Sequence, residues 1–240
     1  MTDHEPCAVL PWDSEFFDLR IGRVISPVLT PADTAAAERW ARHNRVVVLY
    51  ALVDINDHAS RASVEASGFR AVDTRLTLRR TVGPPVAAVE DVPIRQAAAS
   101  DAHALGALAR QSHRNTRFYA DGGFDRDRCD ELYAVWLVQA LSEDDAIVFA
   151  AVDDGVVTGY FSLHQLSSPE CRVGLVGVAP EARGRGVGRA LMAAAVRSAA
   201  QHGAKEMSVV TQGDSTVAVH YYESAGFRPV RAEVWYHRWF

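Results

Sequence analysis

The chain has little cysteine, and its three cysteines give no sign of a disulfide framework or a metal site. Cys7, Cys129 and Cys171 are scattered over 240 residues, without the short spacing that is typical of zinc ligands. A few unpaired cysteines are typical of proteins kept in a reducing compartment. We therefore expect a cytoplasmic protein that binds no metal and uses each cysteine as a small apolar side chain.

A surplus of positive charge and long apolar runs are also missing. The net charge is −5, so the chain offers no general basic field for a nucleic acid. No apolar run reaches the length of a membrane-spanning helix, and the acidic start MTDHEPCAVL does not resemble a signal peptide. With 48% hydrophobic and 23% charged residues, the composition is that of a soluble globular protein with one large or two small domains.

The chain divides near the segment TVGPPVAAVEDVPIR. Pro84-Pro85 cannot continue a helix or a sheet ladder. We therefore expect an N-terminal domain over residues 1–82, a linker over 83–90 and a second domain over 91–240.

The second domain alternates between strand and helix patterns. Ser100 is the expected cap of a helix that ends near His113, and Asp153-Asp154-Gly155 is the expected turn of a hairpin. The other expected elements are a short strand PIRQA, a helix over 126–141, hairpin strands AIVFAAV and VVTGYFSLHQL, a strand CRVGLVGVAP, a helix to about residue 202, a strand EMSVVT, a helix over 215–224 and closing strands in RPVRAEVWYHRW. This mixed order predicts an α/β or α+β sheet fold.

The run RGRGVGR, residues 183–189, lies between an apolar strand and an alanine-rich helix. Glycine is a poor helix residue, so the run requires an explanation in backbone geometry or in a ligand. Glycines expose backbone N–H groups, the helix N-terminus adds unsatisfied donors, and the arginines add full charge. Together they predict a phosphate site, for which we favour a pyrophosphate. The run lacks the ending of a Walker loop and comes too late in the domain for a dinucleotide-binding loop.

The Arg-x-x-Gly-x-Gly spacing of this run resembles the acetyl-CoA loop of the GNAT superfamily of N-acetyltransferases. The segment STVAVHYYESAGF, residues 215–227, resembles the family's Asn-x-x-Ala-x-x-x-Tyr-x-x-x-Gly-Phe motif, with Ser215 in the place of Asn. The resemblance covers residues 91–240 and implies a central mixed, mostly antiparallel sheet flanked by helices, with acetyl-CoA as co-substrate. The residues that it assigns to acetyl-CoA are Val176, Gly177, Val178, Arg183, Gly184, Arg185, Gly186, Val187, Gly188, Arg189 and Ser215.

The resemblance also makes Tyr222 the general acid that protonates the departing thiolate. A phenol, with a pKa of about 10, stays protonated at neutral pH and can donate. The neighbouring Tyr221 is turned by about 100° around the helix, so only one of the two tyrosines faces the thioester. In the family, backbone N–H groups of the strand before the loop contact the thioester carbonyl, and Val176 and Val178 are the candidates here.

The base that takes the proton of the amine is not marked by a motif. His164 is a candidate because the ordinary pKa of histidine lies near neutrality. Glu170, Asp214 and a water molecule are the alternatives.

The first 82 residues contain a partial copy of the second motif. EASGFRAV, residues 65–72, and ESAGFRPV, residues 223–230, are identical at five of eight positions. Val64 stands where Tyr222 stands, and the segment around Ser26-Pro27 has no glycine loop. We expect a vestigial GNAT-like half that binds no second cofactor and extends the sheet or walls the acceptor site.

Three further segments resemble the TDP-fucosamine acetyltransferase family. PWDSEFFDLRIGRV, residues 11–24, is similar to its N-terminal Trp-Asp/Glu-x-x-Phe-Phe signature. Residues 116–137 are similar to its Ser-Arg-Phe segment followed by Tyr-x-x-Trp, with Thr116 in the place of Ser, and VTQGDST resembles its Val-Ala-Thr-Gln stretch. This resemblance covers nearly the whole chain and implies that the acceptor is a dTDP-linked 4-amino-4,6-dideoxyhexose.

The residue types agree with such an acceptor, because a guanidinium pairs bidentately with a diphosphate and aromatic rings stack on thymine or a sugar. Tyr133 and Trp136 are three residues apart on an expected helix and so share a face. Phe118 and Trp136 are equally well explained as core residues. The expected acceptor residues are Arg114, Arg117, Phe118, Tyr119, Tyr133, Trp136 and Gln212.

Two other functions stay open. One is acetyl transfer to another amine, such as an aminoglycoside, a polyamine, an amino acid or a peptide N-terminus. Residues 114–128 hold four arginines against three aspartates, which favours an anionic ligand over a polycation. The other is a non-enzymatic CoA-binding module, which the intact Tyr222 argues against. By analogy, AEVWYHRW, residues 232–239, is expected to offer a sheet edge at which a homodimer forms.

Overall fold

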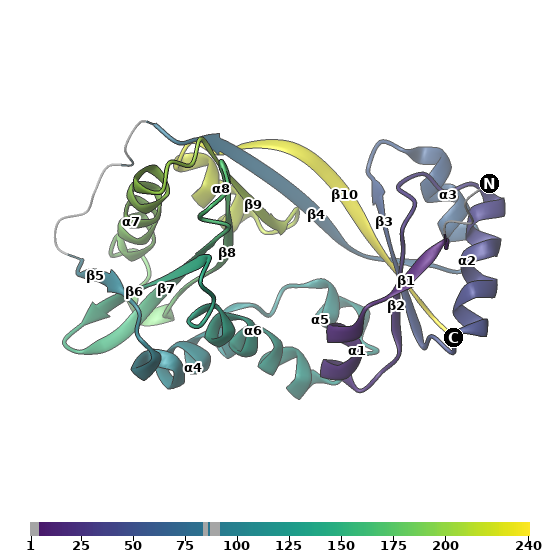
Figure 1. The fold of residues 1–240 in the computed structure, drawn as a ribbon, viewed down its shortest axis with the longest axis horizontal. Helices are drawn as coiled ribbons and strands as arrows, with labels where there is room; N and C mark the ends of the chain where they lie inside the picture. Colours follow the sequence, from purple (N-terminus) through teal and green to yellow (C-terminus); the bar gives the residue numbers. More distant parts are fainter. Residues whose placement is uncertain (1–4, 84–85, 87–91) are drawn as a thin grey trace.

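The structure is a computed structural model that describes residues 5–83, 86 and 92–240, and it consists of one continuous sheet with helices on both faces (Figure 1). The strands of the described residues are β1 (Cys7–Val9), β2 (Ile21–Val24), β3 (Val48–Asp54), β4 (Arg70–Thr81), β5 (Ile94–Gln96), β6 (Ala146–Asp153), β7 (Val156–His164), β8 (Glu170–Val178), β9 (Glu206–Gln212) and β10 (Arg228–Trp239). The helices are α1 (Pro11–Phe17), α2 (Pro31–His43), α3 (His58–Ala66), α4 (Ala102–Ser112), α5 (Arg117–Asp121), α6 (Arg126–Ala140), α7 (Val187–Gln201) and α8 (Thr216–Ser224), with 3-10 turns η1 (Ala99–Asp101) and η2 (Pro180–Ala182).

The sheet order is β1-β2-β3-β10-β4-β9-β8-β7-β6-β5. Within the described residues, neighbouring strands are antiparallel except for the parallel pairs β2–β3 and β8–β9. The predicted α/β fold with a mixed, mostly antiparallel sheet is confirmed. In the part of the chain that the structure describes, no helix has the length and apolar character needed to cross a bilayer.

The two parts of the chain repeat one arrangement of elements. The order β1, β2, α2, β3, α3, β4 is matched by β7, β8, α7, β9, α8, β10, including the parallel pairing of the second and third strands. The helices α3 and α8 have equal length, and each is followed by a glycine in the left-handed region, Gly68 with φ 80° and Gly226 with φ 86°. The sequence repeat around GFR is therefore accompanied by a repeat of the structure.

The two repeats are interlocked through β4 and β10. β10 lies between β3 and β4, and β4 lies between β10 and β9 (Figure 1). Arg70 pairs with His237 and Arg228 pairs with Arg79, so the two strands run side by side over most of their length. Both edges of β10 are occupied, and the prediction that residues 232–239 offer a free edge to a second copy is wrong.

The predicted linker, residues 83–90, lies mostly outside the described residues. The division into domains 1–82 and 91–240 stays a prediction. The last strand of the second part is inserted among the strands of the first, so the sheet itself is not divided at this boundary.

The repeats differ at the start of the helix that follows their second strand. In α2, the Asp33 carboxylate accepts the backbone N–H of Thr30 at 2.9 Å, and the Thr30 hydroxyl accepts the N–H of Asp33 at 3.3 Å. In α7 the cap is Gly186, and no side chain of the described residues caps the helix. The first repeat therefore closes its helix end with its own carboxylate, while the second leaves backbone donors open to a ligand.

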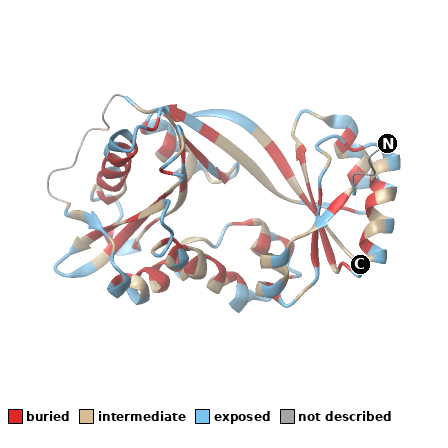
Figure 2. Cartoon of the chain, in the orientation of Figure 1, coloured by how far each residue is buried: buried red, intermediate tan, exposed pale blue. Residues whose placement is uncertain are grey.

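One hydrophobic core joins the two parts. Phe17 and Tyr50 of the first part belong to the same buried cluster as Leu105, Leu132 and Phe161 of the second. A smaller buried cluster lies between helices α2 and α3 and strands β3 and β10. Figure 2 shows the buried residues along the strands and on the sheet-facing sides of the helices. Side chains of the first part thus pack against α5 and α6 of the second.

Most local predictions agree with the structure. The hairpin turn uses Asp154 and Gly155 at positive φ, and the helix predicted over 126–141 is α6. The prediction that Ser100 caps a helix is wrong, because Ser100 lies inside η1 and the Asp101 carboxylate accepts the N–H of Ala98 at 2.8 Å. Asp101 stands at the N-cap position of α4, but its side chain makes no capping bond to that helix. The short helix α5 was not predicted.

Candidate active site

β8 and β9 separate at the point where the predicted cofactor strand begins. Their last ladder pair is Val173 with Val209. Beyond it, β9 stays paired with β4 as far as Gln212, and β8 stays paired with β7 as far as Val178. The backbone of β8 around Val176 is therefore free of ladder partners on the β9 side in the described structure. Such an opening can hold an extended chain and offer it backbone N–H groups.

The glycine loop leads from this opening to the start of α7. Gly184 has φ 74° and Gly186 has φ 84°, conformations that glycine adopts without strain. No described heavy atom lies within 4 Å of the position that a Cβ on Gly184 would take. Gly186 caps the helix, so the N–H groups of Val187, Gly188 and Arg189 point out of its first turn. The loop therefore fits an anionic group at a helix N-terminus.

The loop arginines lie around this position. The Arg183 side chain donates from Nε to the carbonyl oxygen of Val178 at 3.2 Å, which ties the loop to the end of β8. Arg185 lies 3.0 Å from Asp153, with both side chains largely exposed. Exposed ion pairs are weak, so the Arg185 guanidinium stays available to a more highly charged phosphate.

Tyr221 and Tyr222 have different environments, as their positions on the helix predict. The Tyr221 hydroxyl donates to the carbonyl oxygen of Gly188 at 2.8 Å and so joins α8 to the start of α7. Tyr222 is 6% exposed, packs edge-on against Phe227, and makes no hydrogen bond through its hydroxyl with the described residues. Burial raises the pKa of Tyr222, so this phenol stays protonated. Ser215, the α8 cap, makes no capping bond through its side chain to a described residue.

The structure places His164 at the start of the opening, because a Cβ on Gly174, the first residue after the last β8–β9 pair, would lie 2.5 Å from its Nε2. His164 lies at the end of β7, four residues beyond Tyr160, or about 13 Å along a strand. Its ring nitrogens lie 3.1 Å from Glu143 and 3.1 Å from Ser162. Glu170 lies at the same end, at the start of β8, 3.5 Å from Arg79. The ion pair with Arg79 argues against Glu170 as the base, whereas His164 stays a candidate.

Sequence reasoning missed a buried histidine at the opening. His113 Nε2 lies 2.7 Å from the hydroxyl of Tyr160, which pairs with Gly177 of β8. Tyr160 packs so closely on Gly177 that a Cβ there would lie 2.6 Å from the hydroxyl. Burial lowers the pKa of His113 to about 4, so the imidazole is neutral at physiological pH. A lone histidine between two helices carries no motif, and only the fold places it here.

Two predicted acceptor residues gather around one carboxylate. The Tyr119 hydroxyl donates to Asp130, and Arg114 lies 3.6 Å from the other oxygen of that carboxylate. The Arg126 guanidinium lies over the Tyr119 ring. Arg114 is largely exposed and is therefore free to exchange Asp130 for a phosphate.

Of the other predicted acceptor residues, Phe118 lies in the core, and Tyr133 and Trp136 lie next to His113. Phe118 is 3% exposed and packs on Phe17 and Phe124, so it is a core residue and does not stack on an acceptor. Tyr133 stacks on His113 and meets Trp136 edge-on at 5.5 Å, as their shared helix face predicts. Gln212 is half-buried at the end of β9.

Arg117, predicted to contact the acceptor, lies between aromatic rings of both repeats. Its guanidinium lies over the rings of Trp235 at 4.1 Å and Tyr50 at 4.4 Å. Burial lowers the pKa of Arg117, and its Nη1 has no hydrogen-bond partner among the described residues. This half-buried guanidinium lies among aromatic rings between the repeats, which argues against an exposed clamp for a diphosphate.

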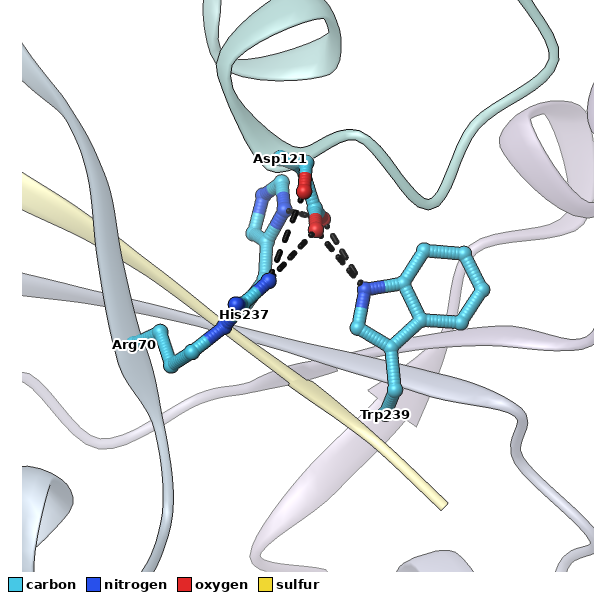
Figure 3. Close-up of polar contacts among 4 residues, drawn as sticks. All are labelled: Arg70, Asp121, His237 and Trp239. Carbon is cyan, nitrogen blue, oxygen red and sulfur yellow. Dashed lines mark hydrogen bonds and ion pairs between the residues drawn. The ribbon is translucent and has the colours of Figure 1, made fainter.

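The buried carboxylate of Asp121 holds α5 against the neighbouring strands β4 and β10. Figure 3 shows Asp121 of α5 between Arg70 of β4 and His237 and Trp239 of β10. His237 Nδ1 lies 2.5 Å from Asp121, and Trp239 Nε1 donates to both carboxylate oxygens at 3.0 Å. Burial alone raises the pKa of Asp121, but these hydrogen bonds and Arg70 lower it overall. The cluster fixes the segment that carries Arg117.

We expect Asp121→Asn to lower the free energy of unfolding by about 3 kcal/mol at pH 7, because buried donors lose their carboxylate. A carboxyl with a lowered pKa stabilises the fold above its unfolded pKa of about 4, and this contribution is lost as the pH falls through the folded value. The deficit of the variant, measured by urea unfolding, should therefore shrink between pH 7 and pH 3. Asp144→Asn, in an exposed turn, is the control. Equal stability of Asp121→Asn and wild type at pH 7 would show that the cluster contributes nothing.

An opening between parallel strands, a helix N-terminus with uncapped backbone N–H groups and a buried phenol are the features expected of an acyl-CoA-dependent transferase. The chain belongs to the acetyltransferase (GNAT) family, whose sequence profile matches residues 104–227. It is an N-acetyltransferase.

Similar proteins extend over both repeats. A dTDP-fucosamine acetyltransferase of Escherichia coli is 28% identical over 235 residues, covering 95% of this chain and 96% of the relative. The spore coat polysaccharide biosynthesis protein SpsD of Bacillus subtilis is 29% identical over 140 residues, which cover 58% of this chain and 48% of the relative. Among solved structures, a GCN5-related N-acetyltransferase from Sphaerobacter thermophilus has a TM-score of 0.71 at 16% identity, covering 97% of this chain and 76% of that one. This last similarity shows the fold.

Proposed function

We propose that this protein transfers the acetyl group of acetyl-CoA to the amino group of a dTDP-linked 4-amino-4,6-dideoxy sugar. The observation that carries the proposal is the similarity to a dTDP-fucosamine acetyltransferase along 95% of the chain. That similarity includes the first repeat, which lies outside the match to the GNAT family. The polysaccharide biosynthesis role in the name of the Bacillus relative agrees with an amino-sugar acceptor.

The residues of the second repeat fit acetyl-CoA. The N–H groups at the start of α7, with Arg183, Arg185 and Arg189, would hold the pyrophosphate. The open strand β8 would pair with the pantetheine, and the N–H groups around Val176 would donate to the thioester oxygen as negative charge develops there. Acetyl-CoA supplies the activated acyl group, and the protein supplies its orientation and the donors.

Tyr222 would donate its proton to the sulfur when the carbon–sulfur bond breaks. The hydroxyl of this largely buried side chain has no hydrogen-bond partner among the described residues, and burial of the side chain keeps it protonated. Tyr160 lies close enough to Tyr222 for that residue to raise the pKa of the Tyr160 hydroxyl. The hydrogen bond between His113 and Tyr160 would hold the Tyr160 ring in place against Gly177 of β8.

A second acceptor class has one observation in its favour. A mycothiol acetyltransferase of Clavibacter sepedonicus is 29% identical over 192 residues, covering 76% of this chain and 60% of the relative. The second candidate function is acetyl transfer to a small amine that carries no nucleotide.

Release of thiol from acetyl-CoA with a panel of amines tests the proposal. The panel holds dTDP-4-amino-4,6-dideoxygalactose, the corresponding glucose compound, the same amino sugars without the nucleotide, an aminoglycoside, spermidine and a short peptide. We expect turnover with a dTDP-linked amino sugar at a kcat/KM well above that of the free sugar. Turnover of another amine with none of the dTDP-sugars would overturn the sugar-nucleotide assignment and leave the acetyltransferase.

A further inference from the structure

A pocket lies at the junction of the two repeats, next to the end of β9. This junction pocket has a volume of about 230 Å³ and is lined by residues 71–74 of β4, by Asn115 and Thr116 between α4 and α5, and by Asp214 after β9. β9 ends at Gln212, and the N–H of the next residue, Gly213, donates to the carbonyl oxygen of Thr74 at 2.7 Å. The pocket therefore begins at the end of β9 from which β8 has already separated.

Two carboxylates from different repeats line the junction pocket. Asp73 comes from β4, and Asp214 comes from the turn before α8. The Asn115 amide donates to Asp214 at 3.2 Å, which fixes one carboxylate. Burial raises the pKa of Asp73 to about 6, and the nearby Asp214 contributes to the rise. A carboxyl in this range is a base that works near neutral pH.

The other charged and titratable groups near Asp73 do not bring the pKa of its carboxyl back to the ordinary value. The backbone N–H of Arg117 donates to Asp73, and the charge of this guanidinium lowers the pKa of the carboxyl only in part, because the side chain lies over Trp235 and Tyr50. Tyr133 of α6 has its pKa raised to about 12, mainly by burial, so it is neutral. Arg75, two residues along β4, is held by Glu233 at 2.9 Å.

A buried hydroxyl in the lining lacks a partner. Thr116 is 6% exposed, and its Oγ1 makes no hydrogen bond within the described residues. Thr116 lies close enough to Tyr133 to lower the pKa of that phenol, yet no hydrogen bond joins the two. Buried hydroxyls are normally hydrogen-bonded, so this oxygen indicates a polar group that enters from the pocket.

We propose that the junction pocket receives the amino group of the acceptor and that Asp73, from the first repeat, takes its proton. The inference rests on the proposed function and names the base of that reaction. Two carboxylates attract an ammonium group, and the Thr116 hydroxyl offers it a further acceptor. His113 does not compete for this role, because its imidazole gains a proton only at much lower pH.

The proton balance of the step is complete. An acceptor that enters as an ammonium ion first gives one proton to solvent. The amine nitrogen then bonds to the acetyl carbon and the carbon–sulfur bond breaks, the nitrogen losing one proton to Asp73 while Tyr222 gives one to the sulfur. Solvent then takes the proton from Asp73 and returns one to Tyr222.

The test compares Asp73→Asn, Asp73→Glu and the control Asp144→Asn in thiol release at saturating dTDP-linked amino sugar between pH 5 and pH 9. We expect the wild-type kcat to fall below about pH 6, because a protonated Asp73 cannot act as a base. Asp73→Asn should lose about a hundredfold in kcat at pH 7 and lose this acidic limb. Asp73→Glu should restore part of the rate and the limb, which a merely structural role would not produce. Wild-type kcat and an unchanged pH profile in Asp73→Asn would overturn the inference while the proposed function stands.

A second measurement decides the matter even if the wild type acetylates none of the panel and the proposed function fails. Carbon NMR titration of the aspartate carboxyl carbons, with Asp73 identified by its absence in Asp73→Asn, gives the pKa of this group directly. A value near 6 that changes when the dTDP-linked amino sugar or a simple alkylamine is added supports the amine site. A value near the ordinary one of about 4, or no response to either amine, overturns it.

Discussion

Gly186→Val is expected to weaken CoA binding by about a hundredfold or more, measured by calorimetry, because several charge-assisted hydrogen bonds are lost together. Gly186 has φ 84°, where a β-branched side chain is strained, and it is the cap from which the first N–H groups of α7 emerge. The valine side chain would occupy the space that the loop offers to the pyrophosphate.

The chain contains a matched control for the backbone strain. Gly203, just after the other end of α7, has φ 80° and open space around its Cβ position. Gly203→Val should lower stability by a similar amount and leave CoA affinity unchanged. Normal CoA affinity in a folded Gly186→Val variant would remove the loop from the binding site.

Tyr222→Phe is expected to lower kcat by at least about tenfold, because the departing thiolate loses its proton donor. The variant keeps the ring that packs on Phe227, so CoA affinity should change little. Since burial raises the pKa of Tyr222, the wild type should lose no activity through its ionisation up to about pH 10. Thiol release and CoA calorimetry on the same preparations check both statements.

Tyr221→Phe is the control for this experiment. It removes one hydroxyl from the adjacent position, where the oxygen is bonded to Gly188. We expect its kcat to stay within about twofold of wild type, with a loss of stability of about 1 kcal/mol from the missing hydrogen bond. Equal kcat values for Tyr222→Phe and wild type would show that water or another group protonates the sulfur.

The family and the position of the cofactor loop followed from the sequence because they depend on local chemistry. Glycines before a helix set a backbone conformation, and that conformation presents N–H groups whatever the rest of the chain does. The partial repeat was also visible in the sequence, since a helix, a glycine with positive φ and a strand are specified by a few adjacent residues.

The base and the acceptor region did not follow from the sequence. His164 has the right chemistry and lies beside Gly174 at the start of the opening, but no motif in the sequence marks it as the base. For Phe118 the sequence left a core position and an acceptor contact equally open, and only the fold places it in the core. Arg117 was predicted as an acceptor contact, yet it lies over Trp235 and Tyr50. Asp73 lies within the N-terminal repeat with no motif around it, and its partners lie in distant parts of the chain.

The sequence by itself determined the family and the succession of a helix, a glycine turn and a strand in both repeats, and it predicted an anion site at the start of α7. The tertiary structure alone decided that β10 is inserted between β3 and β4 and that a pocket forms where the repeats meet. Local conformation depends on neighbouring residues, whereas strand order and burial depend on contacts between residues far apart in the chain, which no single segment specifies.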